Sequence, residues 1–223
     1  MRRREFTAAG WLLFNLPAQA ALRESDAAAG IRAALERGAL TAVQLLGRAD
    51  GFWGNPKVRI PLPEFLSDVA RLLAATGQQR RVDELEIAMN RAAEAAVPEA
   101  KTLLVGAVKS MSVEDARSIL TGGDDAATQF FTRKTRAPLG AKFLPIVSRA
   151  TERVSLAAKY NAVAGKAAAL GLLKADDANI ERYVTGKALD GLYLMIADEE
   201  REIRRDPIGT GSAILKKVFG SLK

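Results

Sequence analysis

Apolar residues recur three and four positions apart over most of the chain, and this spacing predicts helices. The first apolar stripe runs from Ile31 to Leu46. Ser25, ahead of the stripe, is a residue type that caps helices, and Gly47, behind it, is a type that ends them. The pattern therefore predicts a first helix from Ser25 to about Gly47.

The same reasoning predicts about nine or ten short helices, separated by glycines and prolines. The remaining helices are expected at about 63–77, 80–96, 98–110, 112–122, 124–137, 138–153, 155–170, 178–205 and 214–219. Pro138 and Pro145 should make 138–153 one kinked helix or two short ones. No internal repeat is visible, so we expect an all-α, single-domain helix bundle.

Residues 48–63 (RADGFWGNPKVRIPLP) interrupt the helical pattern with two glycines and three prolines. Val58, Ile60 and Leu62 alternate with polar or proline neighbours, which is typical of extended chain. We therefore expect one extended arm rich in proline and glycine, which lies on the surface of the bundle. Phe52 and Trp53 are the residues that would pin it there.

The stretch with the clearest helix boundaries is 111–139. Ser112 and Asp115 have the spacing of a capping box, in which a hydroxyl and a carboxylate satisfy the first backbone N–H groups of a helix. Gly122-Gly123 should end that helix, and Asp124 is expected to cap the next one.

The first twenty residues predict an export signal rather than part of the fold. Arg2-Arg3-Arg4 precede an apolar run that is too short to span a bilayer. Ala18-Gln19-Ala20 is a small-x-small pattern that signal peptidase accepts, so cleavage is expected after Ala20. Arg3-Arg4-Glu5-Phe6 also resembles a twin-arginine signal, with Sec export and a retained amphipathic helix as alternatives. Residues 21–223 should then be a soluble periplasmic domain without a transmembrane segment.

Two absences narrow the possible chemistry. The chain has no cysteine and no histidine, which excludes disulfides, thiolate metal sites, and Ser-His-Asp or Cys-His catalysis. The net charge of +7 favours anionic partners, but the basic residues alternate with acids as on solvated helix faces. We find no clustered basic face with interleaved aromatics, and so expect no nucleic-acid partner. Nothing in the sequence points to a cofactor.

Four segments resemble a known bacterial family. They are NPKVRIPLP (55–63), MNRAAEAAVPEAK (89–101), SVEDARSILTGGDDAATQFFTRKT (112–135) and KALDGLYLMIADEEREIRRDP (187–207). In this order and at this spacing they resemble the domain of unknown function 4197, over essentially all of residues 21–223. The resemblance implies an exported, mostly helical single-domain protein. It implies no catalytic or binding residue, because the function of the family is not established.

Polar residues that stand out from the alanine-rich background form the candidate site. They are Asn90, Arg91, Glu94, Glu114, Asp115, Asp124, Asp125, Thr128 and Arg133. We assign no catalytic residue and no metal ligand among them, because none has the spacing of a known motif.

The acids of 112–125 are open to several interpretations. Gly122-Gly123 with the following acids resembles a loop that binds an anion through its N–H groups, although two aspartates would repel phosphate. Asp115, Asp124 and Asp125 could instead bind Ca²⁺ or Mg²⁺. Glu114, Asp115 and Asp124 could provide the carboxylate pair of a hydrolase. A simpler interpretation is that these acids cap helices and interact with the helix dipoles.

Asn90, Arg91 and Glu94 lie in a predicted helix otherwise full of alanine. Asn90 and Glu94 are four residues apart and therefore share a face. Arg91 could form a buried ion pair with an acid of 112–125. Because buried polar groups need partners, we expect these residues to organise the bundle rather than to catalyse.

The favoured function is a non-enzymatic binding module for a small apolar or anionic ligand, or for an envelope protein. Abundant small residues leave room for a cavity between helices, and the lack of histidine and cysteine argues against catalysis. The alternative is a carboxylate-dependent hydrolase of an envelope polymer. Weak peripheral membrane contact through the last predicted helix, 214–219, is a third hypothesis, because lysines accompany its apolar residues.

Overall fold

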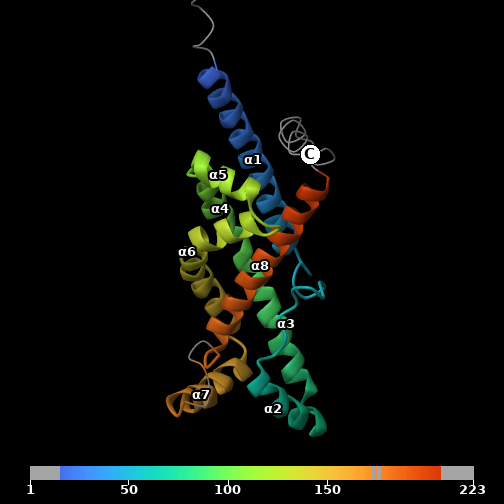
Figure 1. The fold of residues 1–223 in the computed structure, drawn as a ribbon. Coiled ribbons are helices and arrows are strands. Elements are labelled where there is room, and N and C mark those ends of the chain that lie inside the picture. The colour runs from blue at the N-terminus through green and yellow to red at the C-terminus, as the bar shows by residue number, and fades with distance from the viewer. Residues whose placement is uncertain (1–15, 172–173, 175–176, 207–223) are drawn as a thin grey trace, which may run out of the picture.

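The computed structural model describes residues 16–171, 174 and 177–206, and this part of the chain contains helices and no strand (Figure 1). The elements are α1 (Leu16–Leu46), α2 (Glu64–Ala75), α3 (Gln79–Ala96), the short 3-10 helix η1 (Val97–Glu99), α4 (Ala100–Lys109), α5 (Val113–Thr121), α6 (Ala126–Thr151), α7 (Ser155–Ala169) and α8 (Ile180–Arg205). The prediction of an all-α fold is confirmed.

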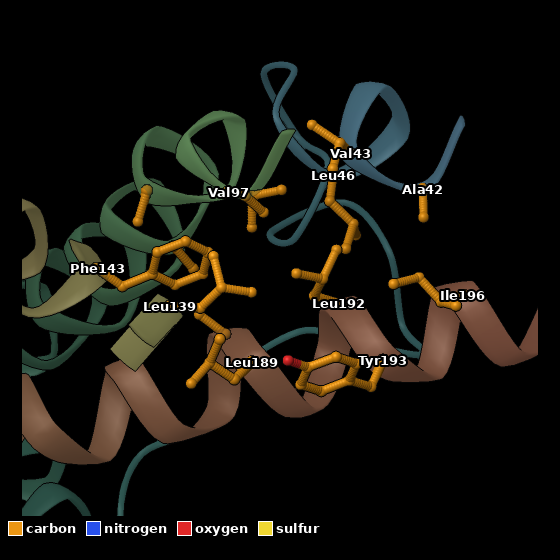
Figure 2. Close-up of a cluster of buried hydrophobic side chains, with 14 of the residues drawn as sticks. Ala42, Val43, Leu46, Val97, Leu139, Phe143, Leu189, Leu192, Tyr193 and Ile196 are labelled. Atoms are coloured by element: carbon orange, nitrogen blue, oxygen red, sulfur yellow. The ribbon is translucent and has the colours of Figure 1, made fainter. Parts of the chain in front are cut away.

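The helix α8 lies at the centre of the bundle, where it packs against α1, α3 and α6 (Figure 1). Its buried stripe has the spacing that the sequence predicted, and it meets buried side chains from three other elements (Figure 2). The residues of this cluster include Leu189, Leu192, Tyr193 and Ile196 of α8, Leu139 and Phe143 of α6, Ala42, Val43 and Leu46 of α1, and Val97 of η1. One continuous apolar core results.

Helix lengths differ from the prediction. The described part contains eight α-helices rather than nine or ten short ones, and α1, α6 and α8 contain 31, 26 and 26 residues. The prediction of a helix break between 124–137 and 138–153 was wrong, because α6 runs through both prolines. Pro138 and Pro145 lie seven residues apart on the exposed side of α6. The carbonyl groups that lose their N–H partners therefore belong to exposed residues and can bind water instead.

The start of α1 also differs from the prediction. Its helical backbone begins at Leu16 and passes through Ser25 without a break. Alanine and leucine on both sides of Ser25 favour helix strongly enough to outweigh the capping preference of one serine.

The segment 48–63 lies partly on the surface, as predicted, but it also inserts buried residues into the core. It forms turns as far as Val58 and is extended only beyond it. Phe52 and Ile60 are 0% and 1% exposed, whereas Trp53 is half-buried beneath the guanidinium of Arg59, which lies 3.6 Å from the ring centroid. The segment forms no helix, as its three prolines predicted. The alternating apolar residues, however, do not mark a surface strand, because Val58 and Ile60 are buried between helices.

Two glycines make this insertion possible. A Cβ atom on Gly51 would lie 2.4 Å from the carbonyl oxygen of Leu46, so the turn that follows α1 excludes a side chain there. A Cβ atom on Gly191 of α8 would lie 2.8 Å from the ring of Phe52. Gly191 therefore leaves the space on the central helix that Phe52 occupies.

The predicted last helix, 214–219, and residues 1–15 of the predicted export signal lie outside the described residues. Within the described part, no helix has both the length and the apolar character needed to cross a membrane.

Candidate functional site

The first polar cluster joins α3 to the segment 48–63. Asn90 is fully buried, and its Oδ1 accepts from the backbone N–H of Ile60 at 2.8 Å while its Nδ2 donates to the carbonyl of Ile60 at 2.9 Å. The side-chain amide thus pairs with one residue of extended chain as a neighbouring strand would. This pairing satisfies two backbone groups that would otherwise be buried without partners.

Glu94, one helical turn further along α3, holds the beginning of the same segment. Its Oε1 accepts from the backbone N–H groups of Phe52 and Trp53 at 3.0 and 3.1 Å. Its Oε2 accepts from Nη1 of Arg91 at 2.7 Å, and Nη2 of Arg91 donates to Asp50, also at 2.7 Å. The expected partner of Arg91 in 112–125 was therefore wrong. We call Asn90, Arg91 and Glu94 the loop clamp.

At the start of α5 the structure confirms the predicted capping box. The backbone N–H of Asp115 donates to the hydroxyl of Ser112, and the backbone N–H of Ser112 donates to the carboxylate of Asp115. The hydroxyl of Ser112 also donates to this carboxylate, and the two hydrogen bonds that the carboxylate accepts from Ser112 hold the pKa of Asp115 below its usual value. Glu114 is exposed on the first turn of the helix.

The predicted cap of the next helix was wrong. Asp125, not Asp124, occupies the N-cap position of α6, and its side chain makes no capping hydrogen bond. Instead the carboxylate of Asp125 accepts from Nε2 of Gln129 at 2.9 Å. Asp124 is exposed.

The true cap of α6 comes from α8. Glu200 accepts from the backbone N–H of Ala127 at 3.0 Å and from the backbone N–H and hydroxyl of Thr128, both at 2.9 Å. Arg204 lies 2.9 Å from the same carboxylate and also donates to the carbonyl of Ile119, at the end of α5. The pair Glu200–Arg204 thus joins the end of one helix to the start of the next.

Sequence reasoning identified Thr128 as a candidate but missed Glu200 and Arg204. A signal was present, because Glu200 follows Ile196 by four residues and precedes Ile203 by three. A charged residue at this spacing falls on the buried stripe of the helix, and a buried carboxylate requires a partner.

The candidate residues therefore do not form one site. The loop clamp lies on α3, whereas Asp115, Asp125 and Arg133 line a hollow between α5 and α6 that Glu114 and Asp124 do not line. Arg133 is exposed there. The acids proposed for hydrolysis thus lie on the surface or accept hydrogen bonds from Ser112. Among the residues that the structure describes, no three acidic side chains gather where they could hold a metal ion.

A second hollow has the composition of a ligand site. It lies between α2, α3 and α7 and encloses about 190 Å³. It is lined by Leu66, Leu73, Arg81, Ser155, Leu156, Lys159, Tyr160 and Val163. We call it the α2–α7 cleft. Among the side chains that the structure describes, its walls are mostly apolar, and the charged lining residues are the cations Arg81 and Lys159. Its volume is below that of pockets that enclose a whole drug-sized molecule.

Tyr160 closes the inner wall of the α2–α7 cleft. Its ring is buried, its hydroxyl donates to the carbonyl of Asp177, and burial raises the pKa of the phenol. This hydrogen bond joins α7 to the segment that leads into α8. Because the hydroxyl of Tyr160 is already hydrogen-bonded to Asp177, a ligand in the cleft would contact the aromatic ring of Tyr160.

Comparison with known proteins gives one finding. The model of the family described as "Protein of unknown function (DUF4197)" matches residues 21–220, as the four sequence segments implied. Searches of curated proteins and of solved structures found no match. The matched range includes the loop clamp, the Glu200–Arg204 pair and all lining residues of the α2–α7 cleft. The chain therefore belongs to the family of proteins of unknown function 4197.

Proposed function

We propose that this protein is exported to the periplasm and acts there as a non-enzymatic binding module, with the α2–α7 cleft as its ligand site. The cleft is the observation that carries the proposal. Its apolar walls suit an alkyl or ring system, and Arg81 and Lys159 suit an anionic group on the same molecule. The ligand expected is therefore a small apolar molecule with a negative charge.

The positions of the polar residues support binding rather than catalysis. Glu114 and Asp124 are exposed, and Asp115 takes part in a helix cap. A glycosidase needs two carboxylates that face each other across a cleft, in environments that separate their pKa values. The loop clamp and the Glu200–Arg204 pair bind backbone groups, so their hydrogen bonds stabilise the fold.

Two observations support export. Residues 1–20 carry the charged, apolar and small-x-small regions of a signal peptide in order. The family match begins at residue 21, directly after the expected cleavage site. Expression of the full chain in a Gram-negative host should deliver to the periplasm a protein whose intact mass corresponds to a start at Ala21. A product of full mass that stays in the cytoplasm would contradict export.

The cleft can be tested with 1-anilinonaphthalene-8-sulfonate, which combines apolar rings with one anionic group. We expect saturable binding to the folded protein, in competition with decanoate. Val163→Glu places a negative charge in the cleft and should weaken binding at least tenfold. Val113→Glu is the matched control, because Val113 and Val163 are 45% and 57% exposed and only Val163 lines the cleft.

Circular dichroism establishes that both variants are folded before affinities are compared. Equal affinities of the two variants would show that the probe binds elsewhere. A wild-type protein that binds neither the probe nor decanoate would overturn the assignment of the cleft.

A further inference from the structure

Helix α7 presents an exposed stripe of basic and apolar residues. The stripe consists of Lys159, Val163, Lys166 and Leu170, which follow one another at intervals of four, three and four residues. This spacing places all four on one side of a helix, with Leu170 directly after its last turn. Val163 and Leu170 are 57% and 76% exposed, and both lysines are exposed. We call these residues the α7 stripe.

Large exposed apolar side chains beside lysines, with no acid on the helix, distinguish this stripe from the other helix surfaces that the structure describes. Helix α7 contains two lysines and no acidic residue. Helices α4 and α6 also carry basic residues without acids, but neither has a large exposed apolar side chain, and the exposed sides of α3 and α8 mix both signs. Large exposed apolar side chains beside lysines, without acids, are typical of helices that lie on an anionic membrane surface. Lysine can rest its aliphatic chain on the acyl boundary while its ammonium group reaches phosphate.

A third large exposed apolar side chain lies at the same end of the molecule. Leu72 of α2 is 66% exposed. Figure 1 shows α2 and α7 together at the end of the bundle opposite the start of α1. Of the six large apolar residues that are exposed in the described part, Leu72, Val163 and Leu170 belong to this end.

We propose that the α2–α7 end of the molecule docks on an anionic lipid surface, with the α7 stripe in contact with the lipid. A protein partner fits less well, because lysine is depleted in the centres of protein interfaces and the stripe has no aromatic residue. Lys159 and Val163 belong both to the stripe and to the wall of the cleft. Docking therefore brings the cleft next to the lipid. This proposal goes beyond ligand binding, and neither requires the other.

Flotation with vesicles tests the docking. The purified wild-type protein, its N-terminus identified by intact mass, is mixed with vesicles of phosphatidylethanolamine and phosphatidylglycerol at three to one. Neutral vesicles contain phosphatidylcholine in place of phosphatidylglycerol. We expect several-fold more protein to float with the anionic vesicles, and most of the difference to disappear in 0.5 M NaCl because salt screens exposed charges.

The double variant K166E/L170E should lose at least three-quarters of the bound fraction. Neither residue lines the cleft, so this variant should still bind the anilinonaphthalene probe. The control K101E/L194E exchanges an exposed lysine of α4 and a 40% exposed leucine of α8, with the same change in net charge. It should float like the wild-type protein.

Hydrogen exchange shows which surface meets the lipid. Anionic vesicles should slow exchange of the amides of residues 155–170 more than elsewhere. Protection confined to other segments would overturn the proposal, as would flotation of K166E/L170E equal to that of the control. Failure of the wild-type protein to float would also overturn it, whereas the assignment of the cleft would fail only if the probe did not bind.

Discussion

Glu94 and Glu200 perform the same task at two places in the molecule. Each is almost fully buried and accepts hydrogen bonds from two consecutive backbone N–H groups. Glu94 pairs with Arg91, three residues earlier on its helix, and Glu200 pairs with Arg204, four residues later on its helix. Burial of a carboxylate is unfavourable unless hydrogen bonds and an opposite charge compensate. Here the compensation attaches one segment of chain to the next.

We expect Glu94→Ala to lower the free energy of unfolding by about 3 kcal/mol, because it leaves two buried backbone N–H groups without an acceptor and leaves Arg91 with Asp50 as its acceptor. Glu84→Ala is the control, because Glu84 pairs with Arg80 in a solvent-exposed contact. It should change stability by less than about 0.5 kcal/mol. Urea unfolding measures both. A loss below 1 kcal/mol for Glu94→Ala would mean that the segment 48–63 is held by its apolar residues alone.

Replacement of Glu199, unlike that of Glu94, should raise the free energy of unfolding, and the gain should depend on pH. Burial, with smaller contributions from Glu202 and Asp198, raises its pKa in the folded protein. The protonated form is therefore favoured by folding, and this stability is lost as the pH rises through the folded-state pKa. Glu199→Gln should stabilise the protein at pH 7, by less than about 1 kcal/mol because the site is partly solvated. The gain should vanish below about pH 4, near the unfolded pKa. An equal gain at both pH values would contradict this cause.

For single residues, the sequence predicted whether a side chain is buried better than it predicted the groups with which that side chain forms hydrogen bonds. Burial and a structural role for Asn90 and Glu94 followed from their place among alanines. The backbone groups that they bind belong to Phe52, Trp53 and Ile60. Every residue has such groups, so the sequence does not show which residue will be the partner. Ser112 and Asp115 were paired correctly because a capping box lies within one helical turn.

At the scale of the elements, Gly191 of α8 is required because the ring of Phe52 packs directly against it. Gly191→Ala would force a Cβ atom to within 2.8 Å of the Phe52 ring. We expect it to destabilise the protein by about 2 kcal/mol through overpacking.

Gly186→Ala, on the same helix, has no heavy atom of another element within 4 Å of the new Cβ atom. It should stabilise the protein by about 0.5–1 kcal/mol, because alanine favours helix over glycine. Thermal unfolding of the two variants gives the comparison. Shifts of the same sign would show that Phe52 moves aside at little cost.

Helix boundaries were predicted where a local signal decided them and missed where the environment did. The ends of α5 followed from Ser112 and Gly122. Pro138 and Pro145 failed to divide α6 because the carbonyl groups left without partners, four residues before each proline, belong to exposed residues. Solvent exposure follows from packing and not from the prolines themselves. The segment 48–63 was recognised as non-helical, but its insertion between α3 and α8 depends on helices far along the chain.

For the whole molecule, the three tyrosines report on cooperativity. Burial raises the pKa of Tyr160, of Tyr193 and of Tyr183, the last to about 12. An unfolded tyrosine ionises near pH 10, so stability is fully present below that pH and falls between about pH 10 and 12. Tyrosinate absorbance at 295 nm should rise together with the loss of helical circular dichroism. Ionisation with a midpoint near pH 10 and intact helices would contradict the burial of Tyr160 and Tyr193 and the partial burial of Tyr183.

The candidate site could not be predicted at this scale. The α2–α7 cleft is built from three helices, of which α7 lies far from α2 and α3 in the sequence. Nothing in the sequence around its described charged residues, Arg81 and Lys159, distinguishes them from other basic residues on helix surfaces. The acids near Asp124 attracted attention because they are close in sequence, whereas ligand sites depend on closeness in space. Family membership, by contrast, followed from segments spread over the chain.

The central position of α8 has a consequence for biosynthesis. Every residue before Ile180 leaves the ribosome ahead of the helix that α1, α3 and α6 pack against. At about 5–20 residues per second, the nascent chain waits roughly 10–40 s for that helix. During this time Phe52, Leu139 and their neighbours lack the surface of α8 that completes their burial, while α1, α3, α4 and α6 can already pack against one another. We therefore expect the core to be completed only near the end of translation, which gives targeting factors and chaperones a long interval in which to bind an incompletely folded chain.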